Sequence, residues 1–106
     1  MYLWVDDLRE PPETGANWLW ARSVSEAKAA IMFYERQRQV DFIHIDLDHD
    51  AGSYAWDGGD YIEVLKWLEQ HQLPDTGYTF HLHTMNPVGR DNMRAIINSN
   101  GWREIK

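Results

Sequence analysis

Several features common in proteins are missing from this chain. It contains no cysteine, which excludes disulfides, thiolate catalysis and cysteine ligands to a metal. No stretch approaches the roughly 18 consecutive apolar residues of a membrane-spanning helix, so we expect no membrane span. The N-terminal segment lacks a basic region and turns acidic at Asp6, unlike a signal peptide. These absences favour a cytoplasmic protein.

Positive charge is also scarce. The 106 residues include 10 Lys and Arg against 17 Asp and Glu, a formal net charge of −7, and the basic residues do not cluster. Binding to the phosphate backbone of duplex DNA is therefore not expected, whereas a small phosphorylated ligand held through a metal ion is compatible with this charge. The length suits a single domain over residues 1–106.

Short apolar runs alternate with amphipathic segments along the chain. The expected strands are residues 2–5, 18–22, 40–47, 78–83 and 102–105, and the expected helices are 23–39, 60–72 and 87–98. Ser23 and Glu26 form a capping box before the first helix, and Pro87 suits the first turn of the last one. This alternation predicts an α/β domain with a mainly parallel sheet.

Polar residues gather at the ends of three expected strands. These clusters are residues 6–7, residues 46–50 and the segment 83–93. In parallel sheets, ligands bind at the carboxyl ends of the strands, beside the point where strand order reverses. The three polar clusters lie at the places where this rule puts a ligand site. We therefore expect the three clusters to form one site.

The acids in the first two clusters predict a metal site. Carboxylates that converge repel one another unless a cation neutralises them or one of them is protonated. The expected metal ligands are Asp6, Asp7, Asp46, Asp48 and Asp50. Oxygen ligands without cysteine suit Mg²⁺ or Mn²⁺, whose coordination is completed by water and a substrate phosphate. The alternative is that these acids are caps and solvated turn residues.

Two of the five histidines fall at strand ends beside the acids. With an ordinary pKa near 6.5, His49 or His83 could act as general acid, general base or metal ligand. The other three, His44, His71 and His81, fall inside expected strands or near a helix end, and we interpret them as structural.

The segment after the fourth expected strand could bind a phosphate. Thr84 offers a hydroxyl and Asn86 an amide, Gly89 permits close approach to the backbone, and Arg90 could add a bidentate contact. The helix that starts there would present free N–H groups and the positive end of its dipole. The alternative is an ordinary loop between a strand and a helix.

The chain is rich in tryptophan, with six in 106 residues. Part of that surplus must lie at the surface or line a cleft. Trp56, in the glycine-rich segment 51–59, is the leading candidate for stacking on a base. Packing within its own loop is the interpretation we favour for it.

Three blocks of the sequence, "LWVDDLREPP", "DLDHDAG" and "HLHTMNPVGRDNM", resemble the signature blocks of the cyclic-phosphate-processing receiver-like domains. These are compact relatives of the response-regulator receiver domain, and the resemblance covers almost the whole chain. It implies a flavodoxin-like, five-stranded sheet of order 2-1-3-4-5 with about three helices. The loop 8–17 would replace the helix after the first strand, and the C-terminal helix would be absent.

The resemblance also implies a function. The activity proposed for the family is the processing of cyclic phosphates, which suggests a metal-dependent phosphoesterase acting on nucleotides or on RNA ends with a 2′,3′-cyclic phosphate. The acidic pocket would consist of Asp6, Asp7 and residues 48–50, with His83 and Asn86 facing it. Asp48 and one of the two histidines, His49 or His83, would carry the chemistry.

The alternative function is a non-catalytic signalling module. Such a receiver-like domain would bind phosphate or metal and use an aspartate, Asp46 or Asp48, as phosphoacceptor. We favour the enzyme, because the histidine, asparagine and arginine side chains exceed what a phosphoacceptor needs. For the side chain that faces the pocket we favour Asp48, with Asp46 second.

Overall fold

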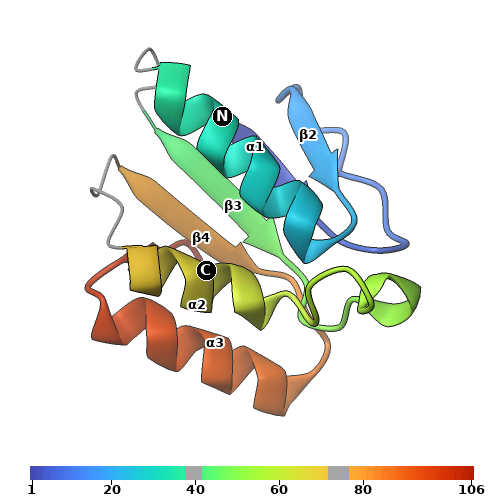
Figure 1. The fold of residues 1–106 in the computed structure, drawn as a ribbon, viewed down its shortest axis with the longest axis vertical. Helices are drawn as coiled ribbons and strands as arrows, with labels where there is room; N and C mark the ends of the chain where they lie inside the picture. Colours follow the sequence, from blue (N-terminus) through green and yellow to red (C-terminus); the bar gives the residue numbers. More distant parts are fainter. Residues whose placement is uncertain (38–41, 72–76) are drawn as a thin grey trace.

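The structure is a computed structural model that describes residues 1–37, 42–71 and 77–106. Its elements are β1 (Tyr2–Val5), β2 (Trp18–Ala21), α1 (Val24–Gln37), β3 (Ile43–Leu47), the short 3₁₀ turn η1 (Gly52–Tyr54), α2 (Ile62–His71), β4 (Tyr78–Leu82), α3 (Pro87–Ser99) and β5 (Arg103–Glu104). The five strands are parallel and lie in the order β2-β1-β3-β4-β5 (Figure 1). The expected receiver-like fold is confirmed.

The predicted element boundaries agree with the structure to within two residues wherever both are described. The hydroxyl of Ser23 accepts a hydrogen bond from the N–H of Glu26 at 3.1 Å, as expected for the cap of α1. The carboxylate of Glu26 accepts from the N–H of Arg22 at 3.2 Å, one residue before the position that a capping box uses. Expected helix and strand residues at 38–41, and residue 72, lie outside the described residues.

All three helices lie on the same face of the sheet (Figure 1). Helix α1 packs on β1 and β2, α2 lies between α1 and α3, and α3 packs on β5. The chain path explains this arrangement, because the connection from β1 to β2 contains no helix and residues 105–106, after β5, form none. The last helix is thus α3, near the end of the chain. Within the described ranges, no helix is long and apolar enough to cross a membrane.

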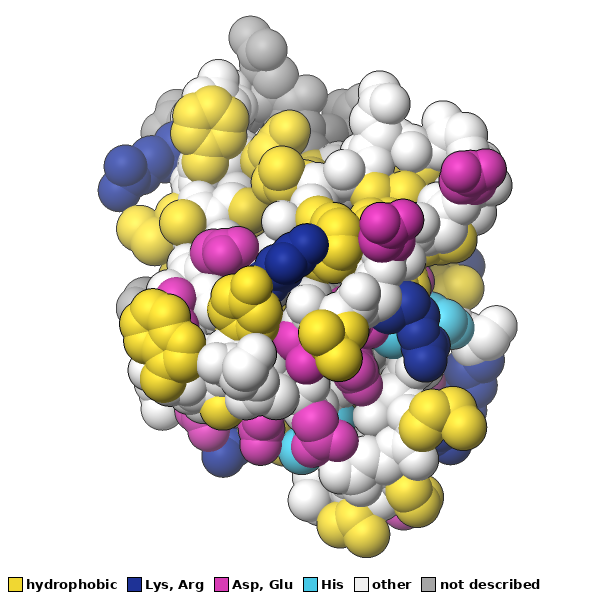
Figure 2. Space-filling view, turned by 90° about the vertical axis from the view of Figure 1, so that its right-hand side faces the viewer, with side chains coloured by type: hydrophobic (Ala, Val, Ile, Leu, Met, Phe, Trp, Pro, Cys, Tyr) yellow, Lys and Arg dark blue, Asp and Glu magenta, His cyan; other side chains and the backbone are white. Residues whose placement is uncertain are grey.

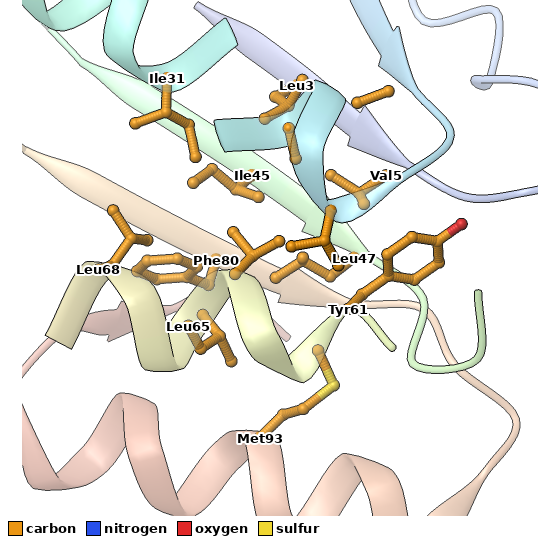
Figure 3. Close-up of a cluster of buried hydrophobic side chains, with 14 of the residues drawn as sticks. Leu3, Val5, Ile31, Ile45, Leu47, Tyr61, Leu65, Leu68, Phe80 and Met93 are labelled. Carbon is orange, nitrogen blue, oxygen red and sulfur yellow. The ribbon is translucent and has the colours of Figure 1, made fainter. Parts of the chain in front are cut away.

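The hydrophobic core fills the space between the sheet and the three helices (Figure 3). Alternate residues of the central strands point into it, and these side chains are fully or almost fully buried: Leu3, Val5, Ile43, Ile45, Leu47, Phe80 and Leu82. They meet the buried sides of the helices, among them Ile31, Leu65, Leu68 and Met93. The core thereby fixes the strand ends that carry the polar clusters.

Among the described residues, no helix covers the opposite face of the sheet, which we call the open face. Its side chains are the alternate residues Tyr2, Trp4, Trp18, Trp20, His44, Asp46, Thr79 and His81. The loop after β1 covers part of it, because the indole N–H of Trp4 donates to the carbonyl of Arg9 at 2.7 Å. The indole N–H of Trp18 donates to the hydroxyl of Thr14 at 3.1 Å.

Candidate metal and phosphate site

The three polar clusters meet at the carboxyl ends of β1, β3 and β4, as the sequence predicts. A cavity of about 300 Å³ lies there, lined by Arg9, Asp48, Asp50, His83, Thr84, Met85 and Asn86. Figure 2 views the side of the molecule toward which the strands run, and carboxylate side chains (magenta) gather on it beside histidine (cyan). The polar edge is therefore an indented site and not a flat solvated surface.

Asp6 is held in its charged form by the turn that follows β1. Its Oδ1 accepts hydrogen bonds from the N–H groups of Leu8 at 2.9 Å and Arg9 at 2.8 Å, and its Oδ2 lies 2.9 Å from Nε2 of His83. Burial acts to raise its pKa, but these hydrogen bonds outweigh burial and keep the pKa below its ordinary value. Asp6 is a buried, fixed carboxylate.

The carboxyl of Asp7 is affected by electrostatic repulsion from the neighbouring acids. Burial raises the pKa of its carboxyl, and the nearby charges of Asp6 and Asp48 raise it further. Its Oδ2 also lies so close to Gly52 that a side chain at that position would overlap it. Gly52, with φ of 56°, is therefore part of the site's construction, and the sequence analysis did not single it out.

The arrangement can accept a metal ion. One ligand atom each from Asp6, Asp48 and His83 lies within 4.8 Å of the other two. A divalent cation among these carboxylates would relieve the repulsion that raises the pKa of Asp7. The donor chemistry and the crowding of charge thus fit a metal site.

The structure separates Asp46 from Asp48. Asp48 lines the cavity, whereas Asp46 is only 7% exposed and lies behind His83. Oδ1 of Asp46 is 2.5 Å from Nδ1 of His83 and 2.9 Å from Nδ1 of His81. Asp48, the residue directly after β3, is therefore the acid that faces the cavity.

His83 has a carboxylate at each ring nitrogen, Asp46 at Nδ1 and Asp6 at Nε2. Its ring stacks on the indole of Trp4, with centroids 4.0 Å apart and planes 1° from parallel. Burial acts to lower the pKa of His83, but the two carboxylates outweigh burial and raise the pKa. His83 lines the cavity as a fixed, positively polarised ring whose nitrogens are both engaged.

His49 lies beside the cavity and does not line it. Its Nδ1 is 2.9 Å from Oδ1 of Asp50 and 3.5 Å from the amide nitrogen of Asn86, both from residues that line the cavity. Its ring packs on Gly89, where an added Cβ would come within 2.5 Å of the ring. The space over Gly89, which we expected a phosphate to use, is thus filled by His49.

The segment after β4 builds one wall of the cavity. Thr84 is buried and its hydroxyl accepts from the N–H of Asn86 at 3.1 Å. Asn86 caps α3, because its side-chain oxygen accepts from the N–H of Gly89 at 3.0 Å. The guanidinium of Arg90 donates to the carbonyl of Thr84 at 2.5 Å and lines a neighbouring cavity instead. The cation at the main cavity is Arg9.

Two further outcomes differ from the sequence-based expectations. Arg9 was not among the candidate residues, although it is the arginine of the first signature block, "LWVDDLREPP". Trp56 is 81% exposed, so the interpretation that it packs within its loop is wrong. The side chain of His71 lies outside the described part of the structure.

The family model of the cyclic-phosphate processing receiver domain matches residues 1–99. Since this match spans nearly the whole chain, the chain belongs to that family. No curated protein and no solved structure gives a significant match.

Proposed function

We propose that this member of the cyclic-phosphate processing receiver family is a metal-dependent phosphoesterase that hydrolyses cyclic phosphates. The observation that carries the proposal is the convergence of Asp6, Asp7 and Asp48 beside the cavity that Arg9 lines. Carboxylates for a cation and a guanidinium for an anion, side by side, suit a phosphate bound together with a metal.

Asp6 and Asp48 would hold the ion, with Asp7 next to them, and the carboxylate oxygens favour Mg²⁺ or Mn²⁺. A divalent ion there would supply positive charge for the phosphoryl oxygens and lower the pKa of a water molecule. Asp50, at the rim with its side chain 61% exposed, and Asp46, behind His83, lie outside this group.

The substrate phosphate would contact side chains from two loops. Arg9 can form two parallel hydrogen bonds to phosphoryl oxygens. The side-chain NH₂ of Asn86 adds a donor, and the start of α3 adds a positive dipole end. Met85, 81% exposed at the rim of the cavity, can pack on the ribose or the base. A nucleotide or the 2′,3′-cyclic end of an RNA would fit this combination.

The reaction needs one proton donor for the leaving group. A water oxygen forms a bond to phosphorus and gives up one proton to the solvent, the bond from phosphorus to one ribose oxygen breaks, and that ribose oxygen takes up a proton. His49 suits this role, because Asp50 orients its Nδ1 and its Nε2 has no hydrogen-bond partner among the described residues. Both nitrogens of His83 are bound to carboxylates, so His83 would instead orient Asp6 and add positive charge.

The test is turnover of a panel of cyclic phosphates. We would incubate the protein with Mg²⁺ or Mn²⁺ and 2′,3′- and 3′,5′-cyclic nucleotides, or an RNA ending in a 2′,3′-cyclic phosphate, and follow the products by ³¹P NMR. We expect Asp48→Asn to lower kcat/KM by about 100-fold or more and His49→Gln to lower kcat. Asp91→Asn, an exposed acid on α3, is the matched control and should leave turnover unchanged.

The signalling alternative predicts a different product. Without turnover of any cyclic phosphate, formation of an acyl phosphate on Asp48 from a small phosphodonor would contradict the enzyme and support a phosphoacceptor domain. Asp48 is the residue to follow in that experiment, because it lines the cavity whereas Asp46 is buried behind His83.

A further inference from the structure

A second group of metal-ligand side chains lies next to the site, on the open face. Its members are Asp46 from β3 and the two histidines of the "HLH" segment, His81 and His83. Nδ1 of His81 lies 2.9 Å and Nδ1 of His83 2.5 Å from the same oxygen, Oδ1 of Asp46. One ligand atom from each of the three lies within 4.8 Å of the other two. Our sequence analysis treated His81 as structural and did not connect it with Asp46.

The backbone of the sheet fixes this group. Asp46 and His81 are register partners in the parallel pair β3 and β4, and His83 follows on the same side two residues later. The N–H of His83 continues the ladder by donating to the carbonyl of Leu47 at 3.0 Å, and Trp4 stacks flat on its ring. The three ligand atoms therefore converge without any loop having to fold around an ion.

The hydrogen bond at the far nitrogen of His83 suits metal binding. A histidine that binds a metal commonly donates its other ring N–H to a carboxylate, which fixes the tautomer. Asp6 provides that carboxylate, with Oδ2 2.9 Å from Nε2 of His83. A metal ion that displaces the proton between Nδ1 and Asp46, while the proton on Nε2 stays, would meet the lone pair of Nδ1 on the side of Asp46.

The remaining coordination positions are accessible. The side chain of His81 is 38% exposed, and it lines a cavity of about 210 Å³ beside β4 and β5. The two arginines of that cavity are already engaged, Arg90 with the carbonyl of Thr84 and Arg94 with Glu104. Water or a small anion could complete the coordination from this side.

We propose that Asp46, His81 and His83 bind a transition-metal ion of the zinc class. Two imidazole nitrogens and one carboxylate with open positions are a donor set typical of Zn²⁺, Fe²⁺ and related ions, which bind nitrogen more strongly than Mg²⁺ does. Tetrahedral bonds of about 2.0–2.2 Å place neighbouring donors roughly 3.3–3.6 Å apart. The two nitrogens, now 2.5 and 2.9 Å from Oδ1 of Asp46, would therefore have to move apart from it by up to about 1 Å. This site shares no ligand with a cation held by Asp6 and Asp48, although it adjoins that site, since Oδ2 of Asp6 lies 2.9 Å from Nε2 of His83.

The test is metal binding by protein freed of its affinity tag and stripped with EDTA. Zn²⁺ would be titrated by calorimetry in excess Mg²⁺, which occupies the carboxylate site, and Co²⁺ would be followed by its visible absorption. We expect one tightly bound Zn²⁺ in the wild type and at least about tenfold weaker binding in His81→Gln. His44→Gln is the matched control, since His44 lies on the same face but its Nδ1 contacts Thr79 at 2.8 Å.

Equal Zn²⁺ affinity in the wild type and His81→Gln, or Zn²⁺ that Mg²⁺ displaces, would overturn the proposal. If circular dichroism shows that His81→Gln is unfolded, ¹⁵N NMR of the wild-type imidazoles decides, because Zn²⁺ must shift Nδ1 of both His81 and His83. The measurement does not use turnover. A failed zinc site therefore leaves the phosphoesterase proposal standing, and a failed turnover assay leaves the zinc site standing.

Discussion

On the face of the sheet that the helices cover, the strands present Leu3, Ile45 and Phe80, each with no exposed surface. On the open face, the neighbouring residues of the same strands include His44 and His81, both partly exposed. The covered face holds the fold together, and the open face carries aromatic rings, histidines and Asp46. The same strands thus carry the apolar core on one side and titratable and aromatic side chains on the other.

The contrast is unusual for a parallel sheet. All-parallel sheets are normally covered on both faces, because the connections between their strands contain helices. Here the connection from β1 to β2 runs as a loop, and that loop covers only part of the open face through the indoles of Trp4 and Trp18. The omitted helix is therefore what leaves room for titratable side chains on a sheet that would otherwise be apolar on both sides.

The largest loss of stability is expected from a substitution on the covered face. Phe80→Ala removes a fully buried ring that stacks on Tyr78 and Trp102, so we expect the free energy of unfolding to fall by about 3–5 kcal/mol. Thr79→Ala, one residue away on the open face, loses only the hydrogen bond to His44 and should cost about 1 kcal/mol. Urea unfolding of both variants measures the difference, and equal losses would contradict the division between the faces.

The sequence predicted the strands and helices that form the covered face well, because each can be recognised within a short stretch of residues. Short apolar runs marked the strands, two of which are followed by acids at Asp6 and Asp48, and Ser23 marked the start of α1 to the residue. The strand order came from the family resemblance and not from the pattern itself, since alternation cannot say which strands are neighbours. The pattern also did not show that all three helices lie on one face.

A moderate loss of stability is expected at the part of the open face that the loop after β1 covers. Trp4 is only 5% exposed, stacks on His83 and donates to the carbonyl of Arg9. Trp4→Leu should lower the free energy of unfolding by about 2–3 kcal/mol, less than the loss for Phe80→Ala. Trp4→Phe keeps a ring over His83 and should cost roughly half as much. Urea unfolding followed by circular dichroism tests this, and a Trp4→Leu variant as stable as the wild type would show that the loop does not cover this face.

The candidate site was harder to predict than the fold, because its geometry depends on side chains that meet across strands. The sequence placed Asp6, Asp48 and His83 at strand ends, and the structure brings them together. It could not show that His83 lies between two carboxylates. That arrangement arises from the pairing of β3 with β4 and from the direction of the Asp6 side chain. For the same reason, the sequence could not show that His81 contacts Asp46.

The smallest loss of stability is expected from removing a charge at the edge of the sheet, where α3 and β5 meet. The guanidinium of Arg94 lies 2.7 Å from Glu104, whose side chain is only 7% exposed, and this contact keeps the pKa of Glu104 below its ordinary value of 4.5. A carboxyl whose pKa is lowered in the folded state adds stability above the unfolded pKa and loses it as the pH falls through the folded pKa. We therefore expect Glu104→Gln to cost about 1 kcal/mol at pH 7, and this cost to disappear as the pH falls through the lowered pKa of the folded state.

Unfolding free energies of both proteins between pH 7 and pH 3 measure that cost, because other acids titrate equally in the two and cancel in the difference. Glu63→Gln is the control, since Glu63 pairs with Lys66 at 3.3 Å on the exposed side of α2, where both side chains are more than 40% exposed. The change in unfolding free energy caused by Glu63→Gln should stay near zero at every pH. A cost for Glu104→Gln that did not change with pH would mean that Glu104 stabilises this edge by packing and not by charge. The edge of the covered face would then be held together in the same way as its centre.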